Sequence, residues 1–369
     1  MKKQIVALSG AMLLVFLVAA QTLDPRAAEI QARHKRGEKI TMEEEDYAQS
    51  AIEHNNQLQS AERQKDWAKE HPARASTGMI PLSELGKGKY HGEEGGLYPG
   101  GVNTPPAAHF NAGLKLAQSI TPLDGEGHPS KDGKIVLITI GMSNTYQESR
   151  RWRIRAVKEP QLNPQLAIVN GAMGAQTAHL IAKPEARYWT LPAQRLREIE
   201  LTPAQVQVAW LKEANPMPKE PFPAEVKKIQ DDLLAILHIL HDKFPNLKMV
   251  YLSNRIYAGY AVAALNPEPH AYETGFAVKW LIADQIAGKP ELNYDPAKGA
   301  VRAPWLAWGP DLWADGMKAR KDGLMYTKED LAPDGTHPGA GAKEKVVDQL
   351  MRFFKTDPTT KMWFKETGH

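Results

Sequence analysis

The stretch that decides the fold is KIVLITIGMSN, residues 134–144. Its first seven residues form a nearly continuous apolar and β-branched run, which is typical of a buried strand in a parallel sheet. Gly141 lets the backbone turn sharply at the strand end, so that Ser143 lies near the start of the next helix. Backbone N–H groups point outward there and stabilise negative charge on an oxygen atom. Thr145 and Glu148 form a candidate capping box of their own, which leaves Ser143 available for chemistry.

Strands and helices alternate after this stretch. Apolar runs predict further strands at residues 165–170, 206–211, 247–252 and 305–308, and helices are expected at 223–244, 275–287 and 341–354. This alternation predicts an α/β fold whose parallel sheet is covered on both faces. In such sheets the chemistry lies at the carboxyl ends of the strands.

A second group of reactive side chains lies in DGTHPG, residues 334–339, just before the last helix. Asp334 and His337 are three residues apart in a loop bounded by Gly and Pro. The carboxylate can therefore contact one imidazole nitrogen while the other nitrogen faces outward as a general base. Such a pair is common in surface loops, but a serine at the end of the first core strand makes the combination more specific.

These two stretches resemble the sequence blocks of one enzyme family. GMSN at 141–144 resembles the GDS block of the SGNH (GDSL-like) hydrolases, and DGTHP at 334–338 resembles their DxxHP block. The resemblance extends over roughly residues 79–355, with the blocks in the family's order. It implies a flavodoxin-like three-layer α/β/α sandwich with a central parallel sheet. It also implies ester hydrolysis through an acyl-enzyme, without a cofactor or metal.

Carried over position by position, the resemblance makes Ser143 the nucleophile, His337 the base and Asp334 the residue that orients the base. Met142 departs from the family pattern, which has Asp after the glycine of the first block. This departure indicates a divergent subfamily. It also keeps open a catalytically silent relative that binds a glycan or a cell-wall polymer.

The family also implies oxyanion donors from three places. The Ser143 amide is joined by a glycine after the second strand, here Gly174, and by an asparagine after the third strand, here Asn215. A different alignment of the second stretch selects the Ala175 amide instead of Gly174. The family's Gly-x-Asn-Asp pattern is absent around Asn215.

Three further residues are candidates for substrate binding. Asn144 follows the serine as it does in the carbohydrate acetylesterase branch (Gly-Gln-Ser-Asn), which points to acylated sugars. Arg255 follows the fourth strand and is expected either to bind a substrate anion or to form an ion pair that holds loops. The Gly/Pro-rich loops at 95–106 either cover the sheet edge near Ser143, with Tyr98 contacting substrate, or brace the far side of the domain.

The composition limits the other classes of function. Of the 369 residues 42% are apolar and 24% charged, and the net charge of +3 is spread over interleaved acidic and basic residues, so nucleic acid is not an expected partner. The chain has no cysteine, which excludes disulfides, thiolate catalysis and Cys-ligated zinc. The motifs of metalloproteases, P-loop nucleotide-binding proteins and dinucleotide-binding proteins are absent.

The amino-terminal sequence predicts export. Lys2 and Lys3 precede an apolar run that ends in Ala19-Ala20, as in a signal peptide (1–20), with an uncleaved anchor as the alternative. No later segment is apolar enough to span a membrane, so a periplasmic or secreted protein is expected. The remaining chain divides into a polar helical extension (21–75), a Gly/Pro-rich lead-in (76–133), a hydrolase core (134–358) and a tail (359–369). Thr41 and Glu44 predict a capping box for a helix in the extension.

The sequence thus predicts a serine esterase that hydrolyses an O-acyl ester of a small molecule or glycan through an acyl-enzyme. An acetyl group on a carbohydrate is the favoured substrate.

Overall fold

The structure is a computed structural model of the chain, and it describes residues 24–366. The predicted signal peptide, residues 1–20, lies outside the described residues, as do the last three residues of the chain.

The core of the protein is a sheet of five parallel strands. The strands are β3 (Ile135–Gly141), β4 (Leu166–Asn170), β5 (Val206–Lys212), β6 (Met249–Leu252) and β7 (Trp305–Trp308). Their order in the sheet is β4-β3-β5-β6-β7. The chain therefore runs from β3 to one edge and then crosses over to the other side. This change of direction places a topological switch point at the carboxyl end of β3, where α/β sheets bind their ligands.

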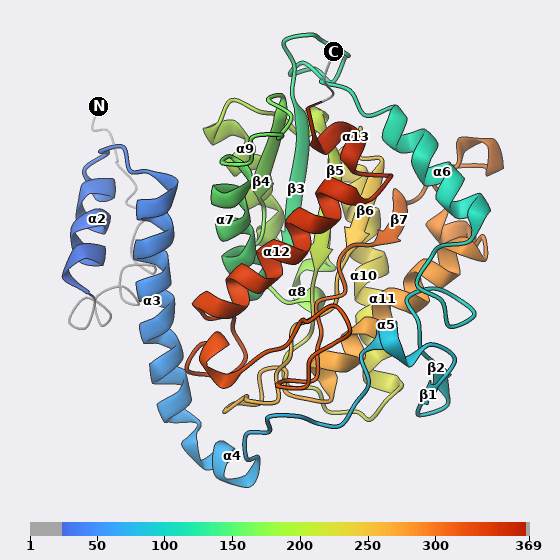
Figure 1. Ribbon diagram of the computed structural model, residues 1–369. Helices are drawn as coiled ribbons and strands as arrows, with labels where there is room; N and C mark the ends of the chain where they lie inside the picture. The colour runs from blue at the N-terminus through green and yellow to red at the C-terminus, as the bar shows by residue number, and fades with distance from the viewer. Residues whose placement is uncertain (1–23, 367–369) are drawn as a thin grey trace, which may run out of the picture.

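Helices cover both faces of the sheet (Figure 1). In Figure 1, α7 (Ser143–Ala156) and α12 (Ala340–Thr356) lie in front of the sheet, with α10 (Ala224–Lys243) and α11 (His270–Ile286) behind it. The apolar residues predicted at helical spacing along α10 are buried: Val226, Ile229, Leu233, Leu237 and Leu240. The predicted α/β fold is confirmed, because a parallel sheet lies between two helical layers in the manner of a flavodoxin-like sandwich.

Shorter elements complete the described part of the chain. The helices are α5 (Leu82–Leu85), α6 (Ala107–Gln118), α8 (Ala178–Ile181), α9 (Thr190–Glu198) and α13 (Lys361–Phe364), and β1 (Lys89–Tyr90) pairs with β2 (Glu93–Glu94) in a two-stranded antiparallel sheet. Single 3₁₀ turns occur at Arg187–Trp189, Pro203–Gln205, Pro290–Leu292, Pro296–Lys298 and Lys328–Asp330.

The amino-terminal extension forms a helical hairpin beside the core, at the left of Figure 1. It consists of α2 (Pro25–Lys35) and α3 (Met42–Arg63), and α4 (Lys65–Glu70) follows it. Thr41 and Glu44 make the predicted capping box at the start of α3. The hairpin has a small apolar cluster of its own, made of Ala27, Ile30 and Ala48 with Ile40 and Ala51 packed against them. We call α2 and α3 together the hairpin.

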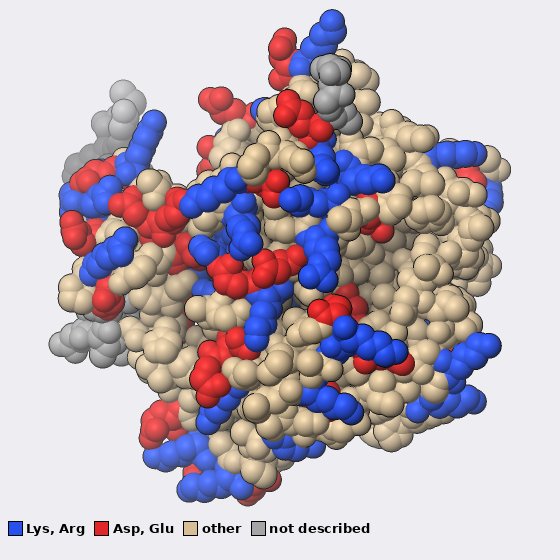
Figure 2. All heavy atoms as spheres, in the orientation of Figure 1, with Lys and Arg blue, Asp and Glu red and all other residues tan. Residues whose placement is uncertain are grey.

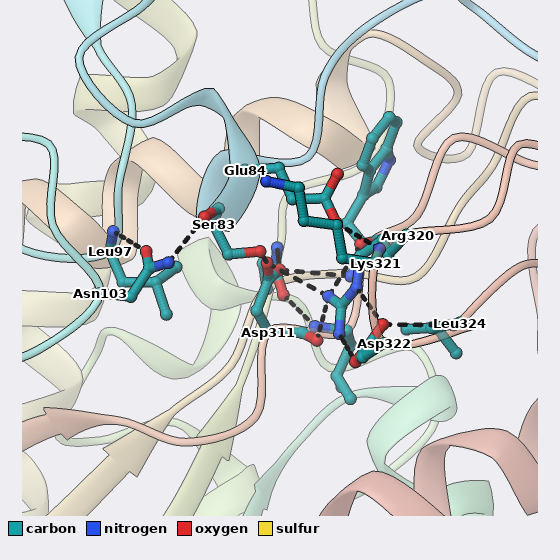
Figure 3. A network of polar contacts seen from close by, with 12 residues as sticks. Ser83, Glu84, Leu97, Asn103, Asp311, Arg320, Lys321, Asp322 and Leu324 are labelled. Carbon is teal, nitrogen blue, oxygen red and sulfur yellow. Dashed lines mark hydrogen bonds and ion pairs between the residues drawn. The ribbon is translucent and has the colours of Figure 1, made fainter.

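The Gly/Pro-rich lead-in is held by a polar network centred on Asp311, in the loop after β7 (Figure 3). Asp311 accepts hydrogen bonds from the Ser83 hydroxyl at 2.6 Å and from the Asn254 amide at 2.7 Å, and it pairs with Arg320 at 3.2 Å. Asn103 donates to the Ser83 carbonyl at 2.7 Å. The lead-in is therefore tied to the loops that follow β6 and β7.

The surface carries charges of both signs. Figure 2 shows acidic and basic side chains intermingled over the hairpin and over the side of the molecule that carries α12. Among residues 24–366, no helix combines the length and the apolar character that crossing a membrane requires.

Candidate active site

Ser143 is the first residue of α7, immediately beyond the carboxyl end of β3. The turn between them depends on Gly141, because a Cβ there would lie 2.4 Å from the Lys212 carbonyl oxygen on β5. A larger residue would push β3 and β5 apart at this point. The sequence GMSN thus turns the chain tightly enough to place the serine at the amino terminus of a 14-residue helix.

His337 and Asp334 lie in the loop that leads into α12, and they face Ser143. The Ser143 Oγ is 2.7 Å from the His337 Nε2, and the His337 Nδ1 is 2.5 Å from an Asp334 carboxylate oxygen. Gly335 has a φ of 63°, and a Cβ on it would lie 1.9 Å from the Tyr260 carbonyl oxygen. Glycine is therefore required for the turn that brings Asp334 back to His337.

The Asp334 carboxylate is buried, and both of its oxygens accept hydrogen bonds. One oxygen accepts the backbone N–H groups of Thr336 and His337, each at 3.0 Å, and the other faces the imidazole. Burial by itself would raise the pKa of Asp334, but the hydrogen bonds and the charge of His337, together with these N–H groups, hold it below its usual range. The aspartate is thus kept ionised, which suits a residue that fixes an imidazole tautomer.

The loop after β4 passes close to Ser143. A Cβ on Gly174 would lie 3.9 Å from the Ser143 Cβ, and Met173 donates its N–H to the Gly141 carbonyl at 2.9 Å. Ala175, the alternative donor, lines the same cavity as the serine and has a φ of 61°. Both candidate amides therefore belong to a loop that contacts the turn around Ser143.

Asn215 also lines this cavity and is held by its neighbours. One N–H of its side-chain amide donates to Asp232 at 2.7 Å, and its carbonyl oxygen accepts the His179 backbone N–H at 2.9 Å. The second N–H of the amide is not used by these contacts. His179 in turn lies 3.6 Å from Asp232.

The cavity that contains Ser143 and His337 has a volume of about 1030 Å³. Its apolar lining includes Leu180, Met217 and Leu265, and the first two are 44% and 61% exposed. Charged residues from α10 and the loop before it form the rim: Lys219, Glu225, Lys228, Asp231 and Asp232. Gln64, which follows the hairpin, also lines this cavity.

Asn144 and Arg255, two of the candidate substrate contacts, do not line this cavity. Both are fully buried, at 1% and 0% exposure. Asn144 donates to the Thr336 carbonyl at 3.1 Å, and Arg255 contacts the same carbonyl and the Asn144 side-chain oxygen, each at 3.4 Å. The expected contact with substrate is corrected to a structural one, in which the two residues connect α7 to the loop of His337.

Tyr98 is also placed elsewhere than expected. It is 4% exposed, it packs in the hydrophobic core, and its hydroxyl accepts the backbone N–H of Trp308 at 3.2 Å. Burial raises the pKa of Tyr98 above its usual range. It does not line the cavity of Ser143. The lead-in loop instead packs against β7, because the Tyr98 ring is buried in the core beside that strand.

The expected capping box at Thr145 and Glu148 is wrong, because α7 begins two residues earlier, at Ser143. Thr145 donates to the Lys212 carbonyl at 2.7 Å, and Glu148 forms an ion pair with the Lys212 ammonium at 2.5 Å. This ion pair between α7 and β5 is fully buried, and the adjacent Glu213 is also buried. Burial raises the pKa of Glu213 well above its usual range.

This buried group of Glu148, Lys212 and Glu213 was not predicted from the sequence. A usable signal was present, because Lys212 and Glu213 follow directly on the apolar run of β5 and had to be buried with it.

No group of three or more potential metal ligands among His, Asp and Glu side chains occurs in residues 24–366.

Comparisons with known proteins add little to this geometry. Neither the models of protein families nor the curated proteins give a match to this chain. Among solved structures, the chain is similar to the periplasmic domain of a lipopolysaccharide acetyltransferase from Salmonella serovar Paratyphi A, at 13% identity and a TM-score of 0.34. The similarity covers 66% of this chain and 95% of that domain. A likeness of this size carries no argument about function.

Proposed function

We propose that this protein is a serine esterase of the SGNH type, which hydrolyses an O-acyl ester on a carbohydrate or a related glycan. The observation that carries the proposal is the continuous hydrogen-bonded line from Ser143 through His337 to Asp334, with distances of 2.7 and 2.5 Å. In this arrangement a base can accept the serine proton while a carboxylate fixes the orientation of that base. Residues 134–358 form the catalytic unit, and the predicted signal peptide would deliver it outside the cytoplasm.

The reaction proceeds in two halves on these residues. His337 takes the proton of the Ser143 hydroxyl as its oxygen attacks the ester carbonyl, and the same proton then passes to the departing alcohol. A water molecule next attacks the acyl-serine, gives its proton to His337, and releases the carboxylic acid while Ser143 regains the proton. Asp334 stays ionised throughout and stabilises the imidazolium.

The negative oxygen of each tetrahedral intermediate needs donors. The Ser143 amide, at the amino terminus of α7, would supply one donor, the Gly174 loop beside it a second, and the Asn215 side-chain amide, which lines the same cavity, a third. A donor of this kind lowers the barrier by about 3 kcal/mol.

The size of the cavity supports a large substrate. Its volume of about 1030 Å³ is at the upper end of the range for small-molecule sites. This volume is far larger than an acetyl group needs. The group on the alcohol side of the ester therefore has room to be one or more sugar units. Its charged rim offers hydrogen-bonding partners for hydroxyl groups.

The test is a combined assay of turnover and labelling. The purified protein should hydrolyse p-nitrophenyl acetate and release acetate from an acetylated sugar, and a fluorophosphonate probe should label Ser143, as mapped by mass spectrometry. Ser143→Ala should lower turnover by at least about a thousandfold and abolish labelling. Ser119→Ala, on the exposed end of α6, is the matched control and should behave as the wild type.

The opposite result has a definite meaning. If the folded protein cleaves no ester and the probe labels no serine, the esterase proposal is wrong, and a catalytically silent glycan-binding protein becomes the better interpretation.

A further inference from the structure

A second cavity lies between the hairpin and the core, with a volume of about 890 Å³. Its walls come from α2 and α3 on one side and from α7, α9 and the end of β4 on the other. Neither Ser143 nor His337 lines it. We call it the hairpin cavity, and its role is independent of the esterase proposal.

Three arginines and one tyrosine of the core lie in the wall of this cavity. The guanidinium groups of Arg150 and Arg195 lie 5.1 and 5.3 Å from the centre of the Tyr146 ring. Arg153, one helical turn after Arg150, lines the same cavity. Arg195 lies near enough to Arg153 to disfavour its charge, and an anion bound between the two would relieve this repulsion.

Among residues 24–366, acidic side chains pair with one of these arginines, Arg150. Arg150 forms ion pairs with Asp46 at 2.6 Å and with Glu53 at 2.9 Å, both on α3. Arg195 donates to the backbone carbonyl oxygens of Asn170 and Ala172, which carry no net charge. These contacts orient the Arg195 guanidinium but leave its charge uncompensated.

Arg153 is the most unusual of the three. It is half-buried, and within residues 24–366 its guanidinium group makes no hydrogen bond and no ion pair, although its backbone carbonyl accepts the Val157 N–H at 3.1 Å. Burial lowers the pKa of Arg153 below its usual range, the charge of Glu45 opposes this, and the charge of Arg195 adds to it. A partly buried guanidinium group without an ion-pair partner is a candidate for binding an anion, because an anion would offset the cost of its partial burial.

The acidic groups that face this cavity do not neutralise the positive charges of Arg153 and Arg195. Glu45 acts on Arg153 only through space, Glu38 is ion-paired with arginines of the hairpin, and Glu198 is exposed and accepts a hydrogen bond from Gln194. Three further basic side chains line the cavity: His34, Lys35 and Lys39. The residues that line the cavity thus include five arginines and lysines against three glutamates.

We propose that the hairpin cavity binds a small molecule through an oxyanion, a phosphate, sulfate or carboxylate group held by Arg153 and Arg195. The planar guanidinium fork matches such groups, because two parallel N–H groups can reach two oxygens at once. The rest of the ligand lies against the mixed wall of Ile30, Ile40 and Leu191. Bound there, the ligand contacts the hairpin and the core together and stabilises their association.

The test measures binding of simple anions to the full protein. Isothermal titration calorimetry and thermal unfolding are carried out with sodium phosphate, sodium sulfate and sodium acetate, each compared with sodium chloride at equal ionic strength. We expect saturable binding and a raised Tm with at least one of the three oxyanions. The one that binds most tightly identifies the ligand class.

Variants assign the site. Arg153→Met should weaken that binding by at least about tenfold, which corresponds to the loss of one charge-assisted hydrogen bond, and Arg153→Lys should restore part of it. Arg197→Met, on the same helix α9 as Arg195 but outside the cavity lining, should bind as the wild type does. Arg195→Met tests the second arginine that is proposed to hold the oxyanion. Should it fail to fold, because Arg195 also supports backbone carbonyls, the Arg153 series still decides.

The proposal is overturned if none of the oxyanions differs from chloride at equal ionic strength. It is equally overturned if binding is found but Arg153→Met binds as tightly as the wild type.

Discussion

Helix α7 contacts two regions of the molecule, and it does so with charges in very different surroundings. On the side of the sheet, Glu148 and Lys212 pair at 2.5 Å with 0% and 1% of their side chains exposed. On the side of the hairpin, Arg150 pairs with Asp46 and Glu53, whose side chains are 15% and 19% exposed. If the hairpin detaches from the core, water can hydrate the Arg150 guanidinium. If Glu148 is lost, Lys212 stays in the core without a partner.

The difference separates two kinds of attachment. The contacts on the sheet side support the loop and helix that hold Ser143 and His337, and they cannot be removed one at a time without leaving an unpaired charge. The ion pairs on the hairpin side can be broken, because water can then hydrate the separated charged groups. We therefore expect the hairpin to detach under conditions that leave the core folded.

The largest effect should come from the carboxylate that orients the base. Asp334→Asn should reduce ester turnover by about three to four orders of magnitude, because the amide favours the wrong imidazole tautomer. Asp46→Asn, the matched change on the hairpin side, should leave turnover unchanged. Steady-state kinetics on p-nitrophenyl acetate measure both. Equal losses in the two variants would mean that the two sides of α7 are not separable.

The next effect concerns stability. Glu148→Gln should lower the free energy of unfolding by about 3–5 kcal/mol, because it strands the Lys212 ammonium in the core. The double variant Glu148→Leu with Lys212→Met should recover most of this loss, since no charge is left buried. Urea unfolding followed by circular dichroism gives both values. A double variant as unstable as the single one would show that packing, not charge, sets this region's stability.

A smaller effect should appear in acid. Because the pKa of Asp334 is lowered in the folded protein, its charge contributes stability above its unfolded-chain pKa, and that contribution is lost as pH falls through the folded value. Unfolding free energy measured from about pH 6 to pH 2 should therefore fall more steeply for the wild type than for Asp334→Asn below about pH 4. Parallel curves would show that the carboxylate is not stabilised by folding.

The smallest effect should be local to the hairpin. Asp46→Asn combined with Glu53→Gln should weaken docking of α3 by roughly 1–2 kcal/mol, because the paired charges are partly exposed and Arg150 can be hydrated once the hairpin opens. Hydrogen exchange should speed up in α3 and not in β3 or β5. Glu62→Gln, which removes an exposed pair with Lys65 at 2.7 Å on the hairpin, is the control and should change neither.

The sequence was most informative where local pattern and global position agree. The runs that became β3 to β7 are predominantly apolar because the sheet is covered on both faces, so their place in the chain could be predicted directly. Ser143 and His337 were paired in the prediction because the stretches that contain them, GMSN and DGTHP, resemble the two sequence blocks of the SGNH hydrolases.

The direction of single side chains was less predictable. Asn144 adjoins Ser143, but consecutive residues of a helix point about 100° apart, so a serine that faces the cavity turns its neighbour toward the core. Arg255 and Tyr98 were expected near substrate because of their residue types. Whether such a side chain turns outward or inward depends on packing partners more than 80 residues away, such as Thr336 and Trp308.

The hairpin shows a second limit. Its helix α2 has a sparse apolar stripe and was not predicted as a separate element. Its docking rests on ion pairs between residues about a hundred positions apart, Asp46 and Arg150 among them. Charges of this kind have no periodicity, so a single sequence does not reveal which of them will meet.

The separation of Ser143 and His337 along the chain has a consequence for biosynthesis. The two residues are 194 positions apart, so at a synthesis rate of roughly 5–20 residues per second the base leaves the ribosome about 10–40 s after the nucleophile. During that interval the nascent polypeptide has its serine but no partner to activate it. The proposed reactivity thus begins only when β7 and the loop before α12 have been added, and a chain interrupted before that point is inert.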